Sequence, residues 1–290
     1  MSTTAPIPTR IVVAVHPRMP EALNDARVFE DLFKSRGLQT RCGPLDDPDL
    51  RQELRSGQFD LLVAVGGDGT ILRAAHLCAP VGVPILGVNA GRLGFLIQLT
   101  RDDWREHFDD LLEGKFWIEN RMMLRAEHVR SGDAQNCWHA LNEAVVTRGQ
   151  VVHPVHISAS VDDRLLTYYV ADGLIAATPT GSTAYALAAG GPILPPELRN
   201  ILLVPIAPHL SVDRAVVLSE GSTVSIQVHN DSGAVLSVDG QTPLVLEQKD
   251  VVQIRAGDYS AKFVRFGDPD YFYRNLTARM NQNSLLGNQQ

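Results

Sequence analysis

Apolar residues in the first hundred positions alternate between continuous runs and helical spacing. Runs dominated by apolar residues at Ile11–Val15, Phe59–Val65 and Pro84–Val88 predict strands that are covered on both faces. Helical spacing extends from about Glu21 to Arg36, and a second helix is predicted from Ile71 to about Cys78. Because strands and helices alternate, this part of the chain predicts a parallel sheet with helices on its faces.

The pattern changes after a predicted helix at Asp102–Leu112. From about Arg121 to Phe266, short runs rich in Val, Ile and Thr are separated by Gly, Asp, Asn and Pro. That spacing predicts a β-rich domain, a sandwich or curved sheets. The runs predicted as strands are Met122–His128, Ala140–Thr147, Val155–Val161, Ile201–Val204, Thr223–His229, Val235–Val238, Leu244–Leu246 and Val251–Ile254. We therefore expect an α/β domain over residues 1–100 and a β-rich domain over residues 101–267.

Length and charge narrow the classes of partner. At 290 residues the chain has the length of two ordinary domains. Its 26 Lys and Arg against 33 Asp and Glu give a net charge of −7. Such a surface repels phosphate backbones and anionic lipids, so we expect no nucleic acid and no membrane as partner. The apolar runs are too short to span a bilayer, and the N-terminus lacks the apolar core of a signal peptide.

Cysteine and histidine usage bears on location and metal chemistry. The three cysteines, Cys42, Cys78 and Cys137, lie far apart, which fits a reducing cytoplasm and no disulfide framework. They cannot form a four-thiolate zinc site, and the nine histidines form no H-E-x-x-H pattern. The sequence therefore predicts a cytoplasmic protein whose own side chains hold no metal ion.

The loop Gly66-Gly67-Asp68-Gly69-Thr70 lies between a predicted strand and a predicted helix. The carboxyl end of a strand is where an open α/β sheet binds its ligands. The glycines allow φ > 0 and a close approach to a phosphate, and Thr70 is placed to cap a helix whose dipole favours an anion. A carboxylate beside phosphates repels them unless a cation lies between them or the carboxylate takes part in the reaction. The loop therefore indicates Mg²⁺-nucleotide phosphates, with Asp68 as base or orienting group for a hydroxyl nucleophile.

A tight turn with an exposed Asp68 accounts for the same loop, and both interpretations stand at this point. The loop matches neither the P-loop pattern G-x-x-x-x-G-K-[ST] nor the dinucleotide pattern G-x-G-x-x-G. Arg73, one turn into the helix, is either a cation near the phosphates or an ordinary solvated residue. The segment Gly87–Phe95 again places an Asn and glycines after a strand. It either completes the cleft or links the two domains.

Polar residues interrupt apolar strands in the second half. Asn142 and Glu143 fall within the predicted strand Ala140–Thr147, and burying both costs several kcal/mol unless both are hydrogen-bonded. They lie either on a solvated edge or against a ligand with hydroxyls, such as a ribose diol. The segment Ser237–Gln241 contains Asp-Gly, which favours a type I′ turn, and it predicts a hairpin.

A strand leads into Thr178–Thr183, a stretch made only of Thr, Ser, Gly and Pro, and a short helix follows at Ala184–Ala189. One interpretation is a helix capped by Thr183 or Ser182. The other is a flat slot for a base or a nicotinamide ring, formed by small residues with Tyr185. Asp172 is then an acceptor for a carboxamide or amino group, or a turn residue.

Two further patterns disfavour other chemistries. His153 and His156 have i,i+3 spacing, but Pro154 and the lack of a third ligand argue against zinc. His153 is either a neighbour of a ligand or a surface residue. Gly181-Ser182-Thr183 lacks the G-x-S-x-G nucleophile elbow, which disfavours a hydrolase.

Taken together, these motifs resemble the bacterial NAD kinase family. The shared segments, in family order, are GGDGT, GVNAGRLGFL, LNEAVVTRG, ADGLIAATPTGSTAYALAAGGPI, VPIAPH and SVDGQ. With the flanking strands the resemblance covers roughly Arg10 to Gly267. GGDGT alone is shared with lipid kinases and phosphofructokinases, whereas TPTGSTAY in this company is specific.

The resemblance implies transfer of the ATP γ-phosphoryl group, with Mg²⁺, to the 2′-hydroxyl of the NAD adenosine ribose, giving NADP. It also implies an α/β N-terminal domain and a β-rich C-terminal domain, with the chain end, residues 268–290, returning to the first. Members of the family are homodimers or homotetramers.

By position, the family's roles fall on residues already singled out. Asp68 matches the proton acceptor, and Gly66, Gly67, Gly69 and Thr70 match its phosphate loop. Asp172 matches the carboxylate that holds the nicotinamide or adenine end. The NAD-binding residues match Asp68, Gly69, Arg73, Asn142, Glu143, His153, Asp172, Thr183, Ala184, Tyr185, Ala188, Ala207 and Gln241.

The chain departs from the family pattern at two positions. Val170 is an Arg in some relatives, which bears on dinucleotide preference, and Ala215 replaces a frequent proline. Two alternative functions are a lipid kinase that shares the GGDGT loop and a nucleotide-binding regulator without catalysis. The charge of −7 and the lack of apolar or basic surface segments disfavour the first. The presence of Asp68 and Asn142-Glu143 disfavours the second.

Overall fold

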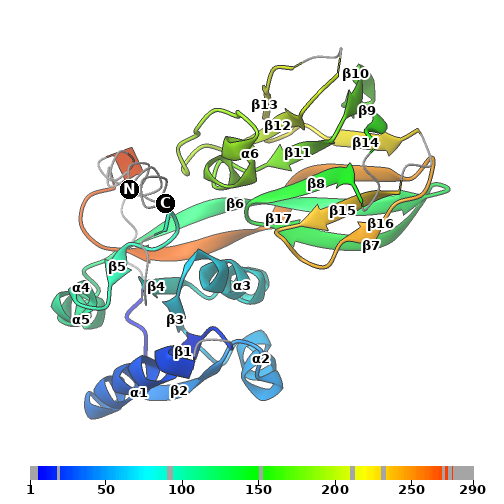
Figure 1. Cartoon of the computed structure of the whole chain (residues 1–290). Helices are drawn as coiled ribbons and strands as arrows, with labels where there is room; N and C mark the ends of the chain where they lie inside the picture. The colour runs from blue at the N-terminus through cyan, green and yellow to red at the C-terminus, as the bar shows by residue number, and fades with distance from the viewer. Residues whose placement is uncertain are drawn as a thin grey trace, which may run out of the picture. The chain divides into compact units, whose positions relative to one another are not determined.

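The apolar runs of the first hundred residues form a parallel sheet in the computed structural model of the chain (Figure 1). The structure describes residues 6–17, 20–89, 94–149, 153–209, 213–229, 233–269, 272–273 and 276. It divides into two compact units, the first made of residues 1–120 and 261–290 and the second of residues 121–260. The boundaries expected from the sequence lay at residues 100 and 267.

In the first unit the strands are ordered β2-β1-β3-β4, all parallel, and β5 and the end of β17 pair with β4. The strands are β1 (Arg10–Val15), β2 (Gln39–Pro44), β3 (Leu61–Gly66), β4 (Ile85–Asn89), β5 (Leu99–Thr100) and β17 (Val251–Arg265). The helices are α1 (Pro20–Ser35), α2 (Pro48–Arg55), α3 (Asp68–Cys78), the 3₁₀ turn η1 (Ala79–Val81), α4 (Asp103–Glu106) and α5 (Phe108–Leu112).

The core of this unit explains why the central strands read as continuous apolar runs. Every residue of β3 is buried, as expected for a strand covered on both faces. Four aromatic side chains from α1, α4 and α5 pack in the core beside these strands: Phe29, Phe33, Trp104 and Phe108. Burying each such ring contributes roughly 2–3 kcal/mol, so the core fixes the sheet whose edge carries the GGDGT loop.

The second unit contains two antiparallel sheets. One has the order β10-β9-β14-β17, with the β6-β7 hairpin also paired to β17, and the other has the order β13-β12-β11-β8-β15-β16. The elements are β6 (Trp117–Arg130), β7 (Asp133–Ala140), β8 (Glu143–Arg148), β9 (Val155–Val161), β10 (Arg164–Ala171), β11 (Gly173–Ala177), the 3₁₀ turn η2 (Gly181–Thr183), α6 (Tyr185–Ala188), β12 (Asn200–Ile206), β13 (Val216–Ser219), β14 (Val224–Val228), β15 (Ala234–Val238) and β16 (Leu244–Val245).

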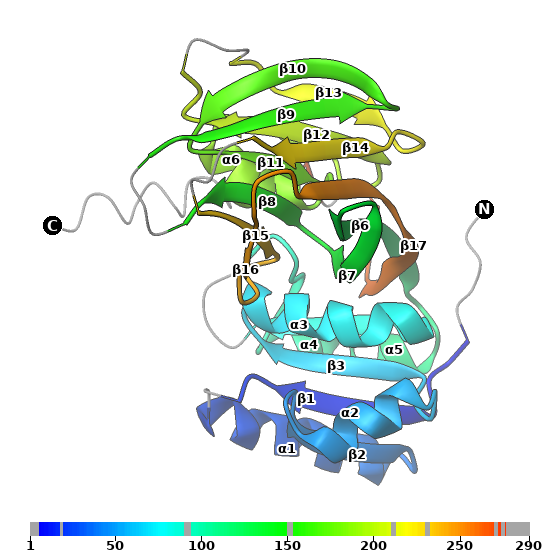
Figure 2. The same cartoon turned by 90° about the vertical axis from the view of Figure 1, so that its right-hand side faces the viewer.

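The two sheets share one core, which confirms the predicted sandwich. Burial alternates along β14 and β15, and the inward residues Ile226 and Leu236, one from each sheet, belong to the same apolar cluster. A smaller cluster lies beneath α6, which packs beside β11 in both views (Figures 1 and 2). The sandwich therefore holds the ends of β8 and β11 in fixed positions.

Several predicted bounds were wrong. α3 begins at Asp68 rather than Ile71, and a break at His107 divides the helix predicted at Asp102–Leu112. Leu141 and Asn142 lie between β7 and β8 and not within one strand. No pattern along the chain predicted β2, α2, β5, β7, β10 or β13, and β17 continues to Arg265, well beyond the predicted Ile254.

Candidate active site

The GGDGT loop turns directly from β3 into α3. Gly67 is the N-cap of α3, with φ −101°, and no side chain among the described residues caps the helix. Thr70 lies inside the first turn, where its N–H donates to the Gly67 carbonyl at 2.8 Å, so the expectation that Thr70 caps the helix was wrong. The first turn of α3 therefore keeps backbone N–H groups that favour an anion.

The glycines of the loop do not adopt a left-handed backbone, and at Gly66 the missing side chain leaves room for Thr70. Gly66, Gly67 and Gly69 lie outside the set of positive-φ residues, which corrects the expectation of φ > 0. A Cβ at Gly66 would overlap the Thr70 side chain. A Cβ at Gly67 or Gly69 would meet no atom of the described residues within 4 Å.

The carboxylate of Asp68 is held by the loop that follows β4. Its two oxygens accept from the N–H groups of Phe95 at 2.8 Å and Leu96 at 3.2 Å. β3 and β4 are parallel neighbours, and Gly66 is paired with Asn89, so both loops leave the same edge of the sheet. Residues 90–93 of the second loop lie outside the described residues, and Arg73 is exposed on α3. The structure thus places Asp68 where both loops meet.

Asn142 and Glu143 lie in a turn that two distant segments hold in place. The Asp239 carboxylate accepts the N–H groups of Leu141 at 2.6 Å and of Asn142 and Glu143 at 2.9 Å each. Thr178 donates its N–H to the Asn142 carbonyl at 2.8 Å and its hydroxyl to the Leu141 carbonyl at 2.5 Å. The backbone of this turn is therefore fully hydrogen-bonded.

Glu143 combines a buried carboxyl oxygen with a like charge nearby. Its Oε2 has no hydrogen-bond partner among the described residues. Burial, and then the Asp239 carboxylate, raise the pKa of Glu143 to about 8, against the opposing effect of a hydrogen bond from the Tyr185 N–H. A ligand with hydroxyl donors would satisfy this oxygen and favour the ionised form.

The turn around η2 packs directly onto Asn142. A Cβ at Gly181 would overlap the Asn142 backbone, so only glycine allows the approach. The N-cap of α6 is Ala184, with no side-chain cap, so the expected capping by Thr183 or Ser182 was wrong. Tyr185 is 44% exposed, and Ala188 is also exposed beside it. The backbone N–H of Tyr185 thus contacts Glu143, and its ring is exposed among small residues.

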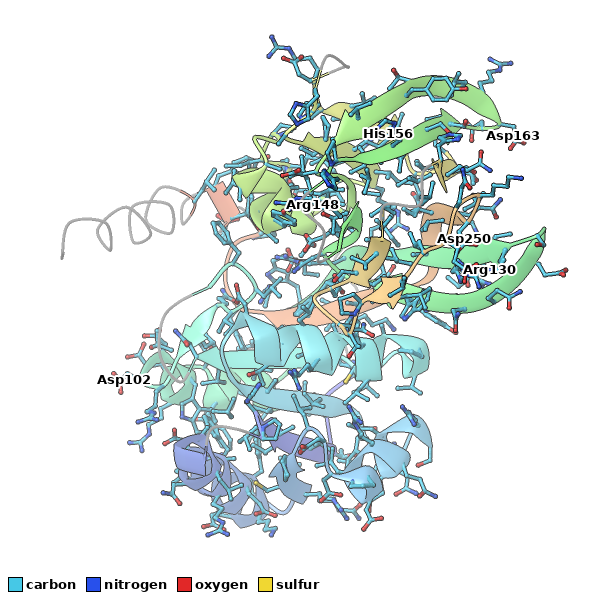
Figure 3. All side chains as sticks on the ribbon, turned by 45° about the vertical axis from the view of Figure 1, so that its right-hand side comes forward. Asp102, Arg130, Arg148, His156, Asp163 and Asp250 are labelled. Carbon is cyan, nitrogen blue, oxygen red and sulfur yellow. The ribbon has the colours of Figure 1, made fainter. Side chains whose placement is uncertain are left out.

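Asp172 and Ala207 lie at the other end of the same sheet. β11 pairs with β8 from Gly173–Thr147 to Ala177–Glu143, a ladder of about 13 Å at ~3.3 Å per residue. Asp172 forms an ion pair with Arg148, whose Nε lies 3.0 Å from its Oδ1 (Figure 3 labels Arg148). The structure therefore separates Asp172 from the Asn142–Glu143 turn by the length of the ladder.

Ala207 and Gln241 lie near these two ends. The N–H of Asp172 donates to the carbonyl of Ile206, which precedes Ala207 in the chain. Gln241 follows the Asp239–Gly240 turn, in which both residues have positive φ, and it donates to the Val238 carbonyl at 2.9 Å. This confirms the predicted hairpin. His153 is exposed, and no group of three or more His, Cys, Asp or Glu in the described chain could hold a metal ion.

The contacts of three residues around the candidate site were not predicted from the sequence. Asp239 was interpreted only as a turn residue, Thr178 only as part of a small-residue stretch, and Arg148 had no role. Their contacts join positions far apart in the chain, such as Leu141 and Asp239, which are 98 residues apart. No local signal marked Asp239, since Asp-Gly is an ordinary pair for a type I′ turn.

Comparison with known proteins identifies the family. The ATP-NAD kinase N-terminal domain model matches residues 15–116, and the ATP-NAD kinase C-terminal domain model matches residues 141–266. The chain belongs to the ATP-NAD kinase family. The NAD kinase of Heliobacterium modesticaldum is 40% identical over 279 residues, covering 93% of this chain and 98% of the relative. The NAD kinase of Symbiobacterium thermophilum is 42% identical over 243 residues, covering 82% and 85%.

Solved structures support the fold of this ATP-NAD kinase. Yeast NADH kinase complexed with NADH aligns with a TM-score of 0.83 and 25% identity over 96% of this chain and 89% of the other. An NAD kinase from Archaeoglobus fulgidus in complex with ATP aligns with a TM-score of 0.75 and 24% identity over 94% and 98%, and it supports the fold alone. As a family member the chain is a kinase that phosphorylates NAD with ATP. No described helix is long and apolar enough to cross a bilayer.

Proposed function

We propose that the kinase transfers the ATP γ-phosphoryl group to the 2′-hydroxyl of the adenosine ribose of NAD, giving NADP and ADP, with Asp68 as the acceptor of the hydroxyl proton. The observation that carries this proposal is a carboxylate held beside the uncapped start of α3. Glycines at the start of a helix allow phosphates to approach its backbone N–H groups. A carboxylate at the same place can accept the proton of an attacking hydroxyl group.

The contacts of Asp68 leave room for this role. Each carboxylate oxygen can accept two hydrogen bonds, and each accepts one from the backbone of the loop after β4. As the ribose oxygen attacks the γ-phosphorus, its proton passes to Asp68 and the bond to ADP breaks. We assign the phosphates to the remaining loop residues, Gly66, Gly67, Gly69 and Thr70, with Arg73 as a nearby cation.

A divalent cation fits this loop only through the nucleotide. Within the described residues no cluster of acidic or histidine side chains could hold a metal ion, and Asp68 is already engaged by two N–H groups. Mg²⁺ commonly binds through substrate phosphates and water, and when bound it neutralises charge that develops on the transferred group. We therefore expect Mg²⁺ to enter with ATP.

For the dinucleotide we assign the turn with the unsatisfied carboxyl oxygen. The Glu143 carboxylate would accept from a ribose diol, and Asn142 would supply the complementary amide. Tyr185 and its small neighbours offer a face for a ring, and Asp172 offers a carboxylate to an amide group. The full proposed NAD-binding set is Asp68, Gly69, Arg73, Asn142, Glu143, His153, Asp172, Thr183, Ala184, Tyr185, Ala188, Ala207 and Gln241.

Self-association and location belong to the same proposal. β10 pairs only with β9 among the described strands and exposes Leu165, Leu166 and Tyr168, an apolar strand edge that a second copy would cover in a homodimer or homotetramer. All three cysteines are free thiols, which supports a cytoplasmic location.

The Asp68→Asn variant tests the proposed chemistry. The amide cannot take the proton, so we expect turnover to fall by about 10²–10⁴-fold while NAD binding stays close to normal. NADP formation from ATP and NAD and calorimetric titration with NAD measure the two effects. Asp102→Asn, at an exposed position (Figure 3), is the control. Near-normal turnover in Asp68→Asn would remove Asp68 from the mechanism.

A further inference from the structure

Asp239 holds the turn that carries Asn142 and Glu143. The carboxylate is only 8% exposed, and each of its three hydrogen bonds to that turn is 2.9 Å or shorter. A carboxylate that accepts several backbone N–H groups holds them more strongly than a neutral acceptor does. The start of β8 is thus fixed by a side chain from the turn after β15.

The backbone at Asp239 suits an acid as well as glycine. Its φ is 47°, in the left-handed region, which Asp and Asn adopt more readily than other residues with side chains. Asp-Gly is a favoured pair for a type I′ turn, so the turn alone admits the acid. The three hydrogen bonds to the Leu141–Glu143 backbone give the side chain a further role.

The Asp239 carboxylate is a like charge that acts on Glu143. The turn after β15 presents Asp239, and the start of α6 presents Tyr185, whose backbone N–H donates to Glu143. β11 places Ala177 opposite Glu143. Behind the Thr178–Thr183 stretch, the Arg121 guanidinium lies 3.5 Å from the Thr180 hydroxyl. Burial and Asp239 both favour the protonated acid.

We propose that Asp239 is a positioning residue of the kinase, which fixes the Asn142–Glu143 turn and keeps Glu143 protonated until NAD binds. This inference rests on the proposed contact between Glu143 and the ribose of NAD. Two hydroxyl donors bind the ionised carboxylate more strongly than the neutral acid, so NAD binding favours release of the proton to solvent, and the two events are coupled. Between the pH at which glutamate ordinarily ionises and about pH 8, affinity for NAD rises with pH.

The test is the pH dependence of KM for NAD in the wild type and in Asp239→Asn. The limb that Glu143→Gln abolishes belongs to Glu143. In Asp239→Asn we expect its midpoint to move to lower pH by roughly one unit, because the like charge is gone. At pH values above the midpoints of both proteins, we also expect the KM for NAD to be roughly tenfold higher in Asp239→Asn than in the wild type. The reason is that an amide group cannot accept all three N–H groups.

Asp162→Asn is the matched control. Asp162 also has a positive φ, of 50°, and its carboxylate also accepts a backbone N–H, from Thr223 at 2.8 Å. Loss of a turn contact alone would affect both variants without moving the midpoint. An unmoved midpoint in Asp239→Asn, or one that moves to higher pH, overturns the proposal.

Two measurements on the wild type decide the matter if Asp239→Asn does not fold. The amides of Leu141, Asn142 and Glu143 should be strongly protected from hydrogen exchange, and the carboxyl carbon of Glu143 should titrate near pH 8 without NAD. Rapid exchange or an ordinary acidic titration overturns the proposal. Absence of NADP formation in the wild type counts instead against the proposed function, since both measurements use the protein without substrate.

Discussion

At the scale of single residues, Gly94 leaves the space that the Asp68 side chain occupies. A Cβ at this position would overlap the Asp68 carboxylate. Gly94 is not among the residues with positive φ, so the position needs glycine for its size and not for its backbone freedom. The orientation of the proposed proton acceptor therefore depends on a residue that carries no functional group.

Gly94→Ala should displace the Asp68 carboxylate and lower kcat. A misplacement of about 1 Å can cost up to ~10²-fold in rate, so we expect a loss of roughly 10–100-fold with a smaller effect on KM for ATP. Steady-state kinetics and thermal unfolding measure activity and stability together. Gly221→Ala, where a Cβ would meet nothing within 4 Å, is the control and should retain both.

Gly181→Ala should act on NAD binding rather than on turnover. The added Cβ would push against the Asn142 backbone and shift the turn that Asp239 and Thr178 hold. We expect KM for NAD to rise by about tenfold or more and kcat to change less, because Asp68 lies in another unit. An equal loss in kcat with KM unchanged would contradict the assignment of this turn to the dinucleotide.

Single residues were predictable where a local pattern carries the chemistry. The glycines around Asp68 and the polar pair inside an apolar run both stand out along the chain. Asp239 and Arg148 do not, because their roles arise from partners that only the folded sheet brings together. Their identification needed the register of β8 against β11 and β15.

At the scale of elements, burial decided which strands could be predicted. The central strands β1, β3 and β11 are buried almost throughout and read as apolar runs. β7 and β13 lack such a run because most of their side chains are exposed or half-buried, and β10 is a strand edge with apolar side chains on its surface. Their strand conformation comes from hydrogen bonds to a neighbour and not from their own composition.

The start of β17 and the end of β6 are joined by Asp250. The carboxylate is buried and accepts two hydrogen bonds from Arg130, at 2.9 and 2.8 Å, and one from the Glu247 N–H at 2.9 Å; Figure 3 shows Arg130 and Asp250 side by side. The Nε2 of the buried His128 lies 2.9 Å from the same carboxylate. These contacts, with Arg130 foremost, hold the pKa of Asp250 below its usual range.

Asp250→Asn should lower the free energy of unfolding near neutral pH by about 2 kcal/mol. A carboxylate with a depressed pKa stabilises the fold above its unfolded value of 3.8 and loses that contribution as pH falls through the folded value. The gap between wild type and variant should therefore shrink below about pH 4. Urea unfolding across this pH range checks it, and a gap that widens toward acid would contradict the assignment.

At the scale of the whole molecule, the exposed apolar edge at β10 bears on assembly. Changing Leu165 and Tyr168 together to Lys should convert an oligomer into monomers, because two charges on each strand edge would face their copies. Sedimentation velocity measures the change. Val245→Lys is the control, since Val245 is 64% exposed at the edge strand β16 of the other sheet. If the double variant kept the solution mass of the wild type, self-association would involve another surface.

The broad architecture was predictable because it follows from periodicity. An α/β half and a β-rich half differ in the spacing of their apolar residues, and the structure has both. The boundaries between the units could not be predicted in the same way, because β6 and β17 are each divided between the two units. A continuous strand carries no local mark of the residue at which its packing partners change.

The first unit is interrupted in sequence, because residues 121–260 are inserted between its two parts. During synthesis the ribosome therefore completes the inserted sandwich before it delivers Phe263, the residue that pairs with Ile85 along β4. Until then the β4 edge beside Ile85 lacks its partner strand, and unpaired strand edges attract other chains. A chain truncated after residue 260 should accordingly contain a folded second unit attached to an aggregation-prone N-terminal segment.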